Sequence, residues 1–141
     1  MYKLTILVFG LLLSMHAKAA DLTVNIENIT QTKSPIICAL FDSKDGFPMK
    51  RNLAKMIVNA DLTGDGATCL FKDIPQNQIA VSIVEDLNKN GKVDTTFVGF
   101  PKEPWAVSNN AKAHTFGPPT FEEASVDGEA SNSINIKLIK P

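Results

Sequence analysis

The feature that most constrains the fold is a series of short strand-like runs, each closed by turn-forming residues. Residues 22–29 alternate apolar and polar side chains with a period of two, and residues 133–139 do the same. This period is typical of a strand that buries one face. The mature sequence contains no convincing helix between these runs. Because a half-buried strand must cover its apolar face with another layer, the pattern predicts an all-β domain.

The expected strands are residues 22–29, 36–41, 68–71, 79–84, 120–126 and 133–139. A further segment is ambiguous, because residues 55–59 could form a strand while residues 49–56 could hold one helical turn. Turn residues such as Asp127-Gly128 separate the runs. About seven short strands with turns between them predict a single antiparallel β-sandwich of the immunoglobulin or prealbumin kind.

One long stretch, residues 99–119, carries no strand pattern. It contains four prolines and few charges, together with Phe100, Trp105 and Phe116. Stretches of this length are uncommon in compact domains unless they are functional or disordered, and the aromatic side chains argue against disorder. We therefore expect one long ordered loop, packed over an edge or end of the sandwich and anchored by Trp105.

The first residues have the pattern of a secretory signal peptide. Lys3 supplies a positive charge, residues 4–13 are almost wholly apolar, and Ala17-Lys18-Ala19 has the small-x-small form of a cleavage site. The apolar run is too short to span a bilayer. We expect cleavage near Ala19, which leaves one domain over residues 20–141 that is periplasmic or secreted and has no membrane span.

The charge balance and the number of cysteines bear on the binding partner and on the presence of a disulfide. Of the 14 basic residues two lie in the signal peptide, so 12 remain against 15 acidic residues, a net charge of −3. The basic residues are scattered, which argues against nucleic-acid binding. An even number of cysteines in an exported chain favours a disulfide between Cys38 and Cys69, with two buried free thiols as the alternative.

The segment from Asp86 to Asp94 has the most regular spacing of potential metal-binding side chains in the sequence. Oxygen-bearing side chains occupy every second position at the start, a glycine follows the third of them, and a carboxylate closes the run. This is the first part of a calcium loop, D-x-N-x-N-G-x-x-D. The expected calcium ligands are the side chains of Asp86, Asn88, Asn90 and Asp94, the carbonyl of Lys92, and Glu103 from the long loop.

The same residues have a second interpretation. An EF-hand has a bidentate glutamate at the twelfth position, but here that position is Phe97, and the flanking segments are strand-like. The segment is therefore not an EF-hand. Asn90-Gly91 is a strong two-residue hairpin signal, so a plain β-hairpin without metal explains the pattern as well. Glu85 is a poorer ligand candidate, because strand alternation points it away from Asp86.

A polar cluster follows the only tryptophan. Trp105 with Ser108, Asn109 and Asn110 could form a sugar-binding loop, in which the ring stacks on the sugar, or could simply be turn residues beside a loop anchor. Zinc would need clustered cysteine and histidine ligands, which the sequence lacks. His114, the one histidine outside the signal peptide, has no neighbouring nucleophile motif and reads as a surface residue.

The sequence also resembles a bacterial exported family known as domain of unknown function 2141. The resemblance lies in the D-x-N-x-N-G-x-x-D run and in the segment G-F-P-K-E-P-W-A-V-S-N-N at residues 99–110. It extends to the segments at residues 39–42 and 119–124 and covers most of the mature chain. It implies a transthyretin-like or carboxypeptidase-regulatory-like sandwich and implies no established activity.

Together these observations predict an exported, non-enzymatic binding or accessory module that carries calcium at residues 86–94. Its partner would be an envelope protein or a carbohydrate. Two alternatives stay open. The first is an enzyme that uses the carboxyl groups of Asp86 and Glu103 on a small substrate. The second is a structural or assembly protein of the cell envelope, which an exposed apolar patch would favour.

Overall fold

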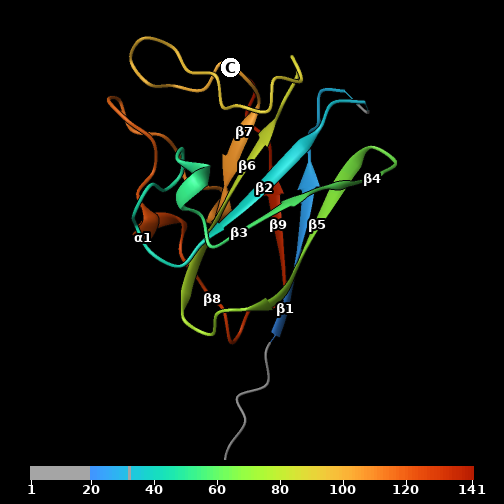
Figure 1. Ribbon diagram of the computed structural model, residues 1–141, viewed down its shortest axis with the longest axis vertical. Helices are drawn as coiled ribbons and strands as arrows, with labels where there is room; N and C mark the ends of the chain where they lie inside the picture. The colour runs from blue at the N-terminus through green and yellow to red at the C-terminus, as the bar shows by residue number, and fades with distance from the viewer. Residues whose placement is uncertain (1–19, 32) are drawn as a thin grey trace, which may run out of the picture.

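Two β-sheets lie face to face in the computed structural model, which describes residues 20–31 and 33–141 (Figure 1). The predicted signal peptide, residues 1–19, lies outside the described residues. The strands are β1 (Ala20–Glu27), β2 (Ile36–Phe41), β3 (Met56–Asn59), β4 (Asp61–Thr63), β5 (Gly66–Ile74), β6 (Gln78–Glu85), β7 (Trp105–Val107), β8 (Val126–Asp127) and β9 (Ser133–Lys137). The predicted all-β sandwich is confirmed.

The two sheets have strand orders β4-β5-β1-β9 and β3-β2-β6-β7, and β8 pairs with β6 beside the second sheet. Two details of the prediction are wrong. The described chain has nine strands rather than about seven. The sandwich is also not wholly antiparallel, because β9 pairs with β1 in parallel, with Val24 opposite Ile134. Alternation predicts which face of a strand is buried, but it carries no information about the direction of the neighbouring strand.

Period-two burial builds the core between the sheets. In β1 the side chains of Leu22, Val24 and Ile26 are buried while the residues between them are partly exposed. They pack with the buried side chains of the facing sheet, including Leu40 and Ile83. One covalent link also joins the two layers of this core.

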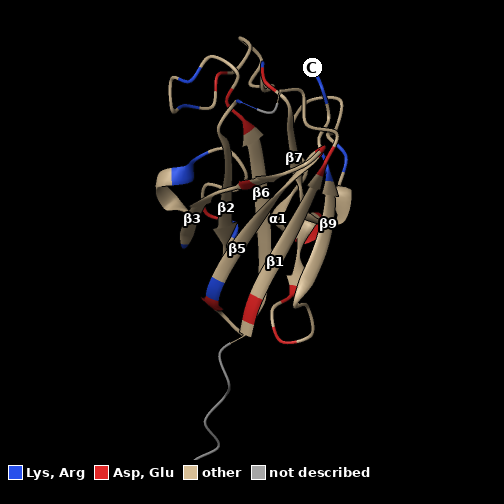
Figure 2. Ribbon diagram, turned by 90° about the vertical axis from the view of Figure 1, so that its right-hand side faces the viewer, with Lys and Arg blue, Asp and Glu red and all other residues tan. Residues whose placement is uncertain are grey.

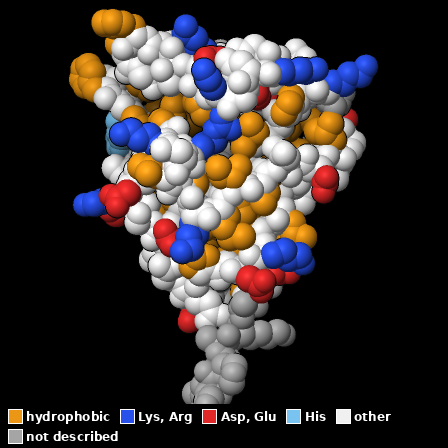
Figure 3. Space-filling model, in the orientation of Figure 1, with side chains coloured by type: hydrophobic (Ala, Val, Ile, Leu, Met, Phe, Trp, Pro, Cys, Tyr) orange, Lys and Arg blue, Asp and Glu red, His pale blue; other side chains and the backbone are white. Residues whose placement is uncertain are grey.

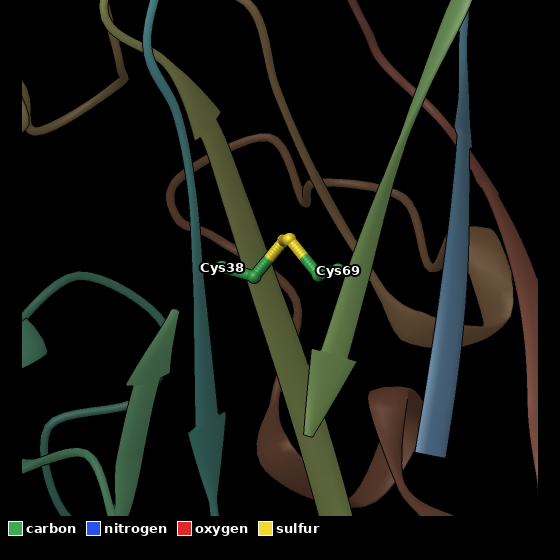
Figure 4. The surroundings of a disulfide bond; sticks show 2 residues. All are labelled: Cys38 and Cys69. Carbon is green, nitrogen blue, oxygen red and sulfur yellow. A yellow bond between two sulfur atoms is a disulfide. The ribbon is translucent and has the colours of Figure 1, made fainter. Parts of the chain in front are cut away.

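That link is the disulfide between Cys38 on β2 and Cys69 on β5, which crosses from one sheet to the other (Figure 4). Both cysteines are fully buried, and the bridge closes a segment with a sequence separation of 31. The predicted pairing is confirmed.

The ambiguous segment and one of the expected strands differ from the strand pattern in the structure. Residues 49–60 contain a 3-10 helix, η1 (Arg51–Leu53), as well as strand β3, so each of the two expectations is partly met. The expected strand at residues 120–126 is wrong, because this segment forms the short helix α1 (Phe121–Ala124) before β8. Thr120 and Glu123 form a capping box, in which each side chain bonds to the backbone of the other residue.

The predicted long loop is ordered but is not one continuous loop. Its middle forms β7, which pairs with β6, and the 3-10 helix η2 (Ser108–Asn110) follows directly. Trp105 is 7% exposed and therefore anchors the segment as expected, although it does so from a strand. Among the described residues no helix is both long and apolar enough to cross a bilayer. Lysine and arginine are dispersed along loops and strand ends, as Figure 2 shows.

Candidate functional site

The candidate site lies in the connection between β6 and β7, which runs across the top of the molecule in Figure 1. The last residue of β6 and the first residue of the connection face in opposite directions, as alternation predicts. Glu85 is fully buried and accepts hydrogen bonds from the backbone N–H groups of Thr30 and Gln31. Asp86 is 2% exposed and points instead into the turn that follows it.

Pairing of β6 with β7 brings the two ends of the connection together. Val84 is opposite Trp105, and beyond that pair the N–H of Glu85 donates to the carbonyl of Pro104 at 2.9 Å. Continuing this register by one more residue places Asp86 opposite Glu103. The sequence predicted that Glu103 folds back over the turn, and the strand pairing is the physical reason that it does.

Asp86 organises the first half of the turn. Its Oδ1 accepts from the N–H of Asn90 at 3.2 Å, and its Oδ2 accepts from the N–H of Gly91 at 2.8 Å. Lys89 and Gly91 both have positive φ, 59° and 73°, which bends the backbone so that these N–H groups converge. The sequence predicted this conformation at the glycine but gave no sign of it at Lys89.

Asparagine side chains extend the same pattern. The Oδ1 of Asn88 accepts from the N–H of Asn90 at 3.1 Å, and the Oδ1 of Asn90 accepts from the N–H of Lys92 at 2.8 Å. These bonds are Asx turns, in which a side chain replaces the backbone carbonyl. Among the described residues β6 pairs only with β2, β7 and β8. The alternative of a plain two-stranded hairpin at Asn90-Gly91 is therefore wrong.

Asp94 closes the turn. Its Oδ2 accepts from the Nδ2 atoms of Asn88 and Asn90, both at 2.6 Å. These two bonds, with a smaller contribution from the charges of Lys102 and Lys92, hold the pKa of the Asp94 carboxyl below its usual range. In this conformation Asp94 therefore gives up its proton at a lower pH than an ordinary aspartate.

Glu103 is the most unusual group of the site. It is 4% exposed, and its Oε1 accepts from the backbone N–H of Leu87 at 2.9 Å. Its Oε2 is buried and has no hydrogen-bond partner. This carboxylate borders a hollow of about 360 Å³, whose lining residues are Leu87, Asn88, Asp94, Lys102 and Glu103. Glu103 thus borders the hollow and carries one carboxylate oxygen without a hydrogen-bond partner.

In this conformation the carboxylates do not surround a single point. Within residues 20–31 and 33–141 no three His, Cys, Asp or Glu side chains lie close enough together to hold a metal ion. Asn88 and Asn90 present nitrogen, not oxygen, to Asp94. Four of the six expected ligand residues are thus joined in one hydrogen-bonded turn, Lys92 contributes its N–H to that turn, and Glu103 stands beside it.

Sequence reasoning missed one brace of the turn. The Nη2 of Arg51, on η1, donates to the carbonyl of Gly91 at 2.7 Å. The two residues are 40 positions apart, so no local pattern could indicate the contact. The bond ties the turn to η1.

The predicted sugar-binding residues mostly serve the backbone. The Oγ of Ser108 is buried, accepts from the N–H of Val81 at 2.9 Å and donates to the carbonyl of Ala124. The Nδ2 of Asn109 donates to the carbonyls of Glu123 and Ser125. Trp105 is buried, so its ring has no free face for a sugar in this conformation.

Asn110 has a different role. Its Oδ1 accepts from the N–H of Lys137 at 2.8 Å, and its Nδ2 donates to the carbonyl of Asn135 at 3.2 Å. The amide thus occupies hydrogen-bonding groups of the edge strand β9. Asn110 also borders a groove of about 640 Å³ between η2 and the C-terminal segment, with Ile136 and Leu138 among its apolar lining residues.

Comparison with known proteins gives one match. A family model described as an uncharacterized protein conserved in bacteria (DUF2141) matches residues 24–135, which include both sheets and the whole candidate site. No curated protein and no solved structure shows significant similarity to this chain.

Proposed function

We propose, for a chain that belongs to the DUF2141 family of uncharacterized bacterial proteins, the function of an exported, non-enzymatic calcium-binding module. The site is the turn from Asp86 to Asp94 together with Glu103. The module's partner would be an envelope protein or a carbohydrate. The buried disulfide supports an oxidising compartment, the periplasm or the medium, because such bridges are rare in the cytosol.

The observation that carries the proposal is the unpartnered Oε2 of Glu103. Leaving a buried polar atom without a partner costs about 1–3 kcal/mol, and more when the group is charged. A hard divalent cation in the adjoining hollow would remove that cost, because calcium prefers carboxylate and amide oxygens. No group among the described residues donates a hydrogen bond to this oxygen.

Binding requires a small rearrangement of the turn. The side-chain amides of Asn88 and Asn90 rotate, so that each presents its Oδ1 in place of its Nδ2. Asp94 then exchanges two hydrogen bonds for one metal ligand bond. Asp86 keeps its bonds to the N–H groups of Asn90 and Gly91 and directs a remaining lone pair to the ion. The carbonyl of Lys92 completes the set.

Binding is favoured over catalysis by the surroundings of Asp86. Both of its carboxylate oxygens already accept backbone hydrogen bonds, and the residue is 2% exposed. A general base must lie within reach of a substrate, and the 2% exposure of Asp86 leaves little access for one. A carboxylate fixed in this way suits a ligand-positioning role better than proton transfer.

Isothermal titration calorimetry with calcium tests the proposal on the chain from Ala20. We expect binding in the millimolar range, as for extracellular calcium modules, and a rise in melting temperature with calcium concentration. Magnesium should bind more weakly, because it demands a rigid octahedral geometry.

Three variants sharpen the test. Glu103→Gln and Asp94→Asn each remove a charged ligand and should abolish both the heat and the thermal shift. Glu122→Gln is the matched control, because this exposed glutamate lies on α1, away from the turn. Near-ultraviolet circular dichroism verifies that each variant is folded. Absence of heat and thermal shift for the unmodified chain at millimolar calcium would sink the proposal, as would equal binding by the Glu103→Gln variant.

A further inference from the structure

Two large apolar side chains protrude from the same connection. Phe97 is fully exposed (107%) and Val98 is 73% exposed, and we refer to these two residues as the apolar tip. Figure 3 shows hydrophobic side chains standing out from the upper edge of the molecule, where Figure 1 places this connection. Two large apolar side chains exposed side by side in this way indicate a contact with something apolar.

The apolar tip is held in a defined turn. Thr96 and Phe100 are joined by backbone and side-chain hydrogen bonds, and the N–H of Gly99 donates to the carbonyl of Thr96 at 2.9 Å. At its base the N–H of Lys102 donates to the carbonyl of Asp94 at 2.8 Å. Asp94 is an expected calcium ligand, so the apolar tip and the cation turn share one rigid base.

The basic and acidic side chains of the connection differ in how exposed they are. The connection carries three lysines, Lys89, Lys92 and Lys102, and all three are exposed. It also carries three carboxylates, of which Asp86 and Glu103 are buried and Asp94 is half-buried. The exposed charges of the connection are therefore all basic. One bound calcium ion would change the formal charge of the connection from zero to +2.

We propose that the apolar tip docks into the interface of an anionic lipid bilayer, with the three lysines against the headgroups. Phe97 and Val98 insert to the level of the acyl boundary, while lysine side chains reach anionic headgroups through their flexible stems. A convex apolar tip with a basic surround fits a lipid surface better than a protein pocket, because a bilayer needs no complementary shape. The calcium dependence of docking rests on the proposed function, whereas the docking itself does not.

Vesicle co-sedimentation tests the inference with the chain from Ala20. Vesicles of phosphatidylcholine mixed with phosphatidylglycerol are compared with vesicles of phosphatidylcholine alone, each with calcium and with chelator. We expect binding to the anionic vesicles only, weakened by added salt and strengthened severalfold by calcium. Phe97→Ser should reduce binding by about tenfold or more, because it removes the largest inserted side chain.

Phe116→Ser is the matched control, because Phe116 is also nearly fully exposed (95%) but lies in a different turn, bridged between His114 and Gly117. This variant should bind vesicles as the unmodified chain does. No binding to anionic vesicles under any condition would overturn the inference, as expected if the apolar tip fits a protein partner. Equal loss in both variants would overturn it as well.

The calcium and lipid outcomes can be separated. Calcium heat in calorimetry with no vesicle binding leaves the calcium proposal intact and overturns docking. Vesicle binding that depends on Phe97 but not on calcium supports docking and overturns its coupling to the ion. Tryptophan is buried here, so a fluorescent label on an introduced cysteine at Val98 gives an independent readout of insertion depth.

Discussion

The Oε1 of Glu103 accepts a hydrogen bond from the backbone N–H of Leu87 at 2.9 Å, across 16 positions of sequence. This bond continues the pairing of β6 with β7, whose last backbone bond runs from Glu85 to Pro104. One carboxylate oxygen is thus used to close the connection, and the other is left buried without a partner. The same side chain therefore stabilises the connection through one oxygen and destabilises it through the other.

Glu103→Gln should raise stability in chelator and remove the stability that calcium adds to the unmodified chain. A glutamine can still accept from Leu87, and an uncharged amide costs less to bury than a carboxylate with an unpartnered oxygen. In chelator we expect the free energy of unfolding to rise by about 1–3 kcal/mol. At millimolar calcium the increment gained by the unmodified chain should be missing from the variant. Urea denaturation under both conditions measures this, and a less stable variant in chelator would contradict it.

Removal of the disulfide should be the most costly change in the core. Cys38→Ala combined with Cys69→Ala frees a segment with a sequence separation of 31 in the unfolded chain. We expect a loss of about 3–4 kcal/mol in the free energy of unfolding, from the restored entropy of the unfolded state. Chemical denaturation measures the loss. Reduction of the unmodified chain should give a similar value, and an unchanged midpoint in the double variant would show that the bridge does not stabilise the fold.

Asn110 should protect the edge of β9. Asn110→Gly removes the side chain but tolerates the positive φ of 48° at this position. The amide of Lys137 then loses its acceptor, so its hydrogen exchange should accelerate by about fivefold, the equivalent of one hydrogen bond. Asn109→Gly is the control, because Asn109 also has positive φ but bonds to Glu123 and Ser125 instead. Equal acceleration in both variants would contradict the role given to Asn110.

Acid should loosen the cap of α1 before it affects the core. The N–H of Thr120, and to a smaller extent His114, bond the Glu123 carboxylate and hold its pKa below its ordinary value of 4.5. A lowered pKa in the folded state stabilises the fold above pH 4.5, and this contribution is lost as pH falls through the lower, folded value. Titration of the Glu123 side chain by NMR measures the shift. Glu123→Gln should remove this pH dependence, and an unshifted Glu123 would contradict the capping geometry.

The sequence contained a signal for α1 that the strand interpretation overlooked. Thr120 and Glu123 have the S/T-x-x-E spacing of a capping box, which marks a helix start. The neighbouring apolar residues favoured a strand, and the prediction based on them was wrong. Four residues are too few for helical periodicity to be visible, so only the cap could have identified the element.

At the candidate site, local chemistry was predictable and long-range geometry was only partly so. The turn formed by Asp86, Asn88, Asn90 and Gly91 follows from short-range Asx chemistry and one flexible backbone position. The return of Glu103 was predicted, but the pairing that causes it was not, since no strand was expected at residues 105–107. The Arg51 brace left no trace in the sequence.

The sequence by itself determined the sandwich class, the buried faces of the strands, the cysteine pairing and the oxygen-rich turn, because each depends on residue type at short spacing or on composition. Only the tertiary structure decided the parallel pairing of β1 with β9, the pairing of β6 with β7 that returns Glu103 to Leu87, and the unpartnered Oε2 of Glu103. Those features arise from contacts between distant segments, whose register and direction are fixed by how the two sheets pack and not by any local pattern of residues.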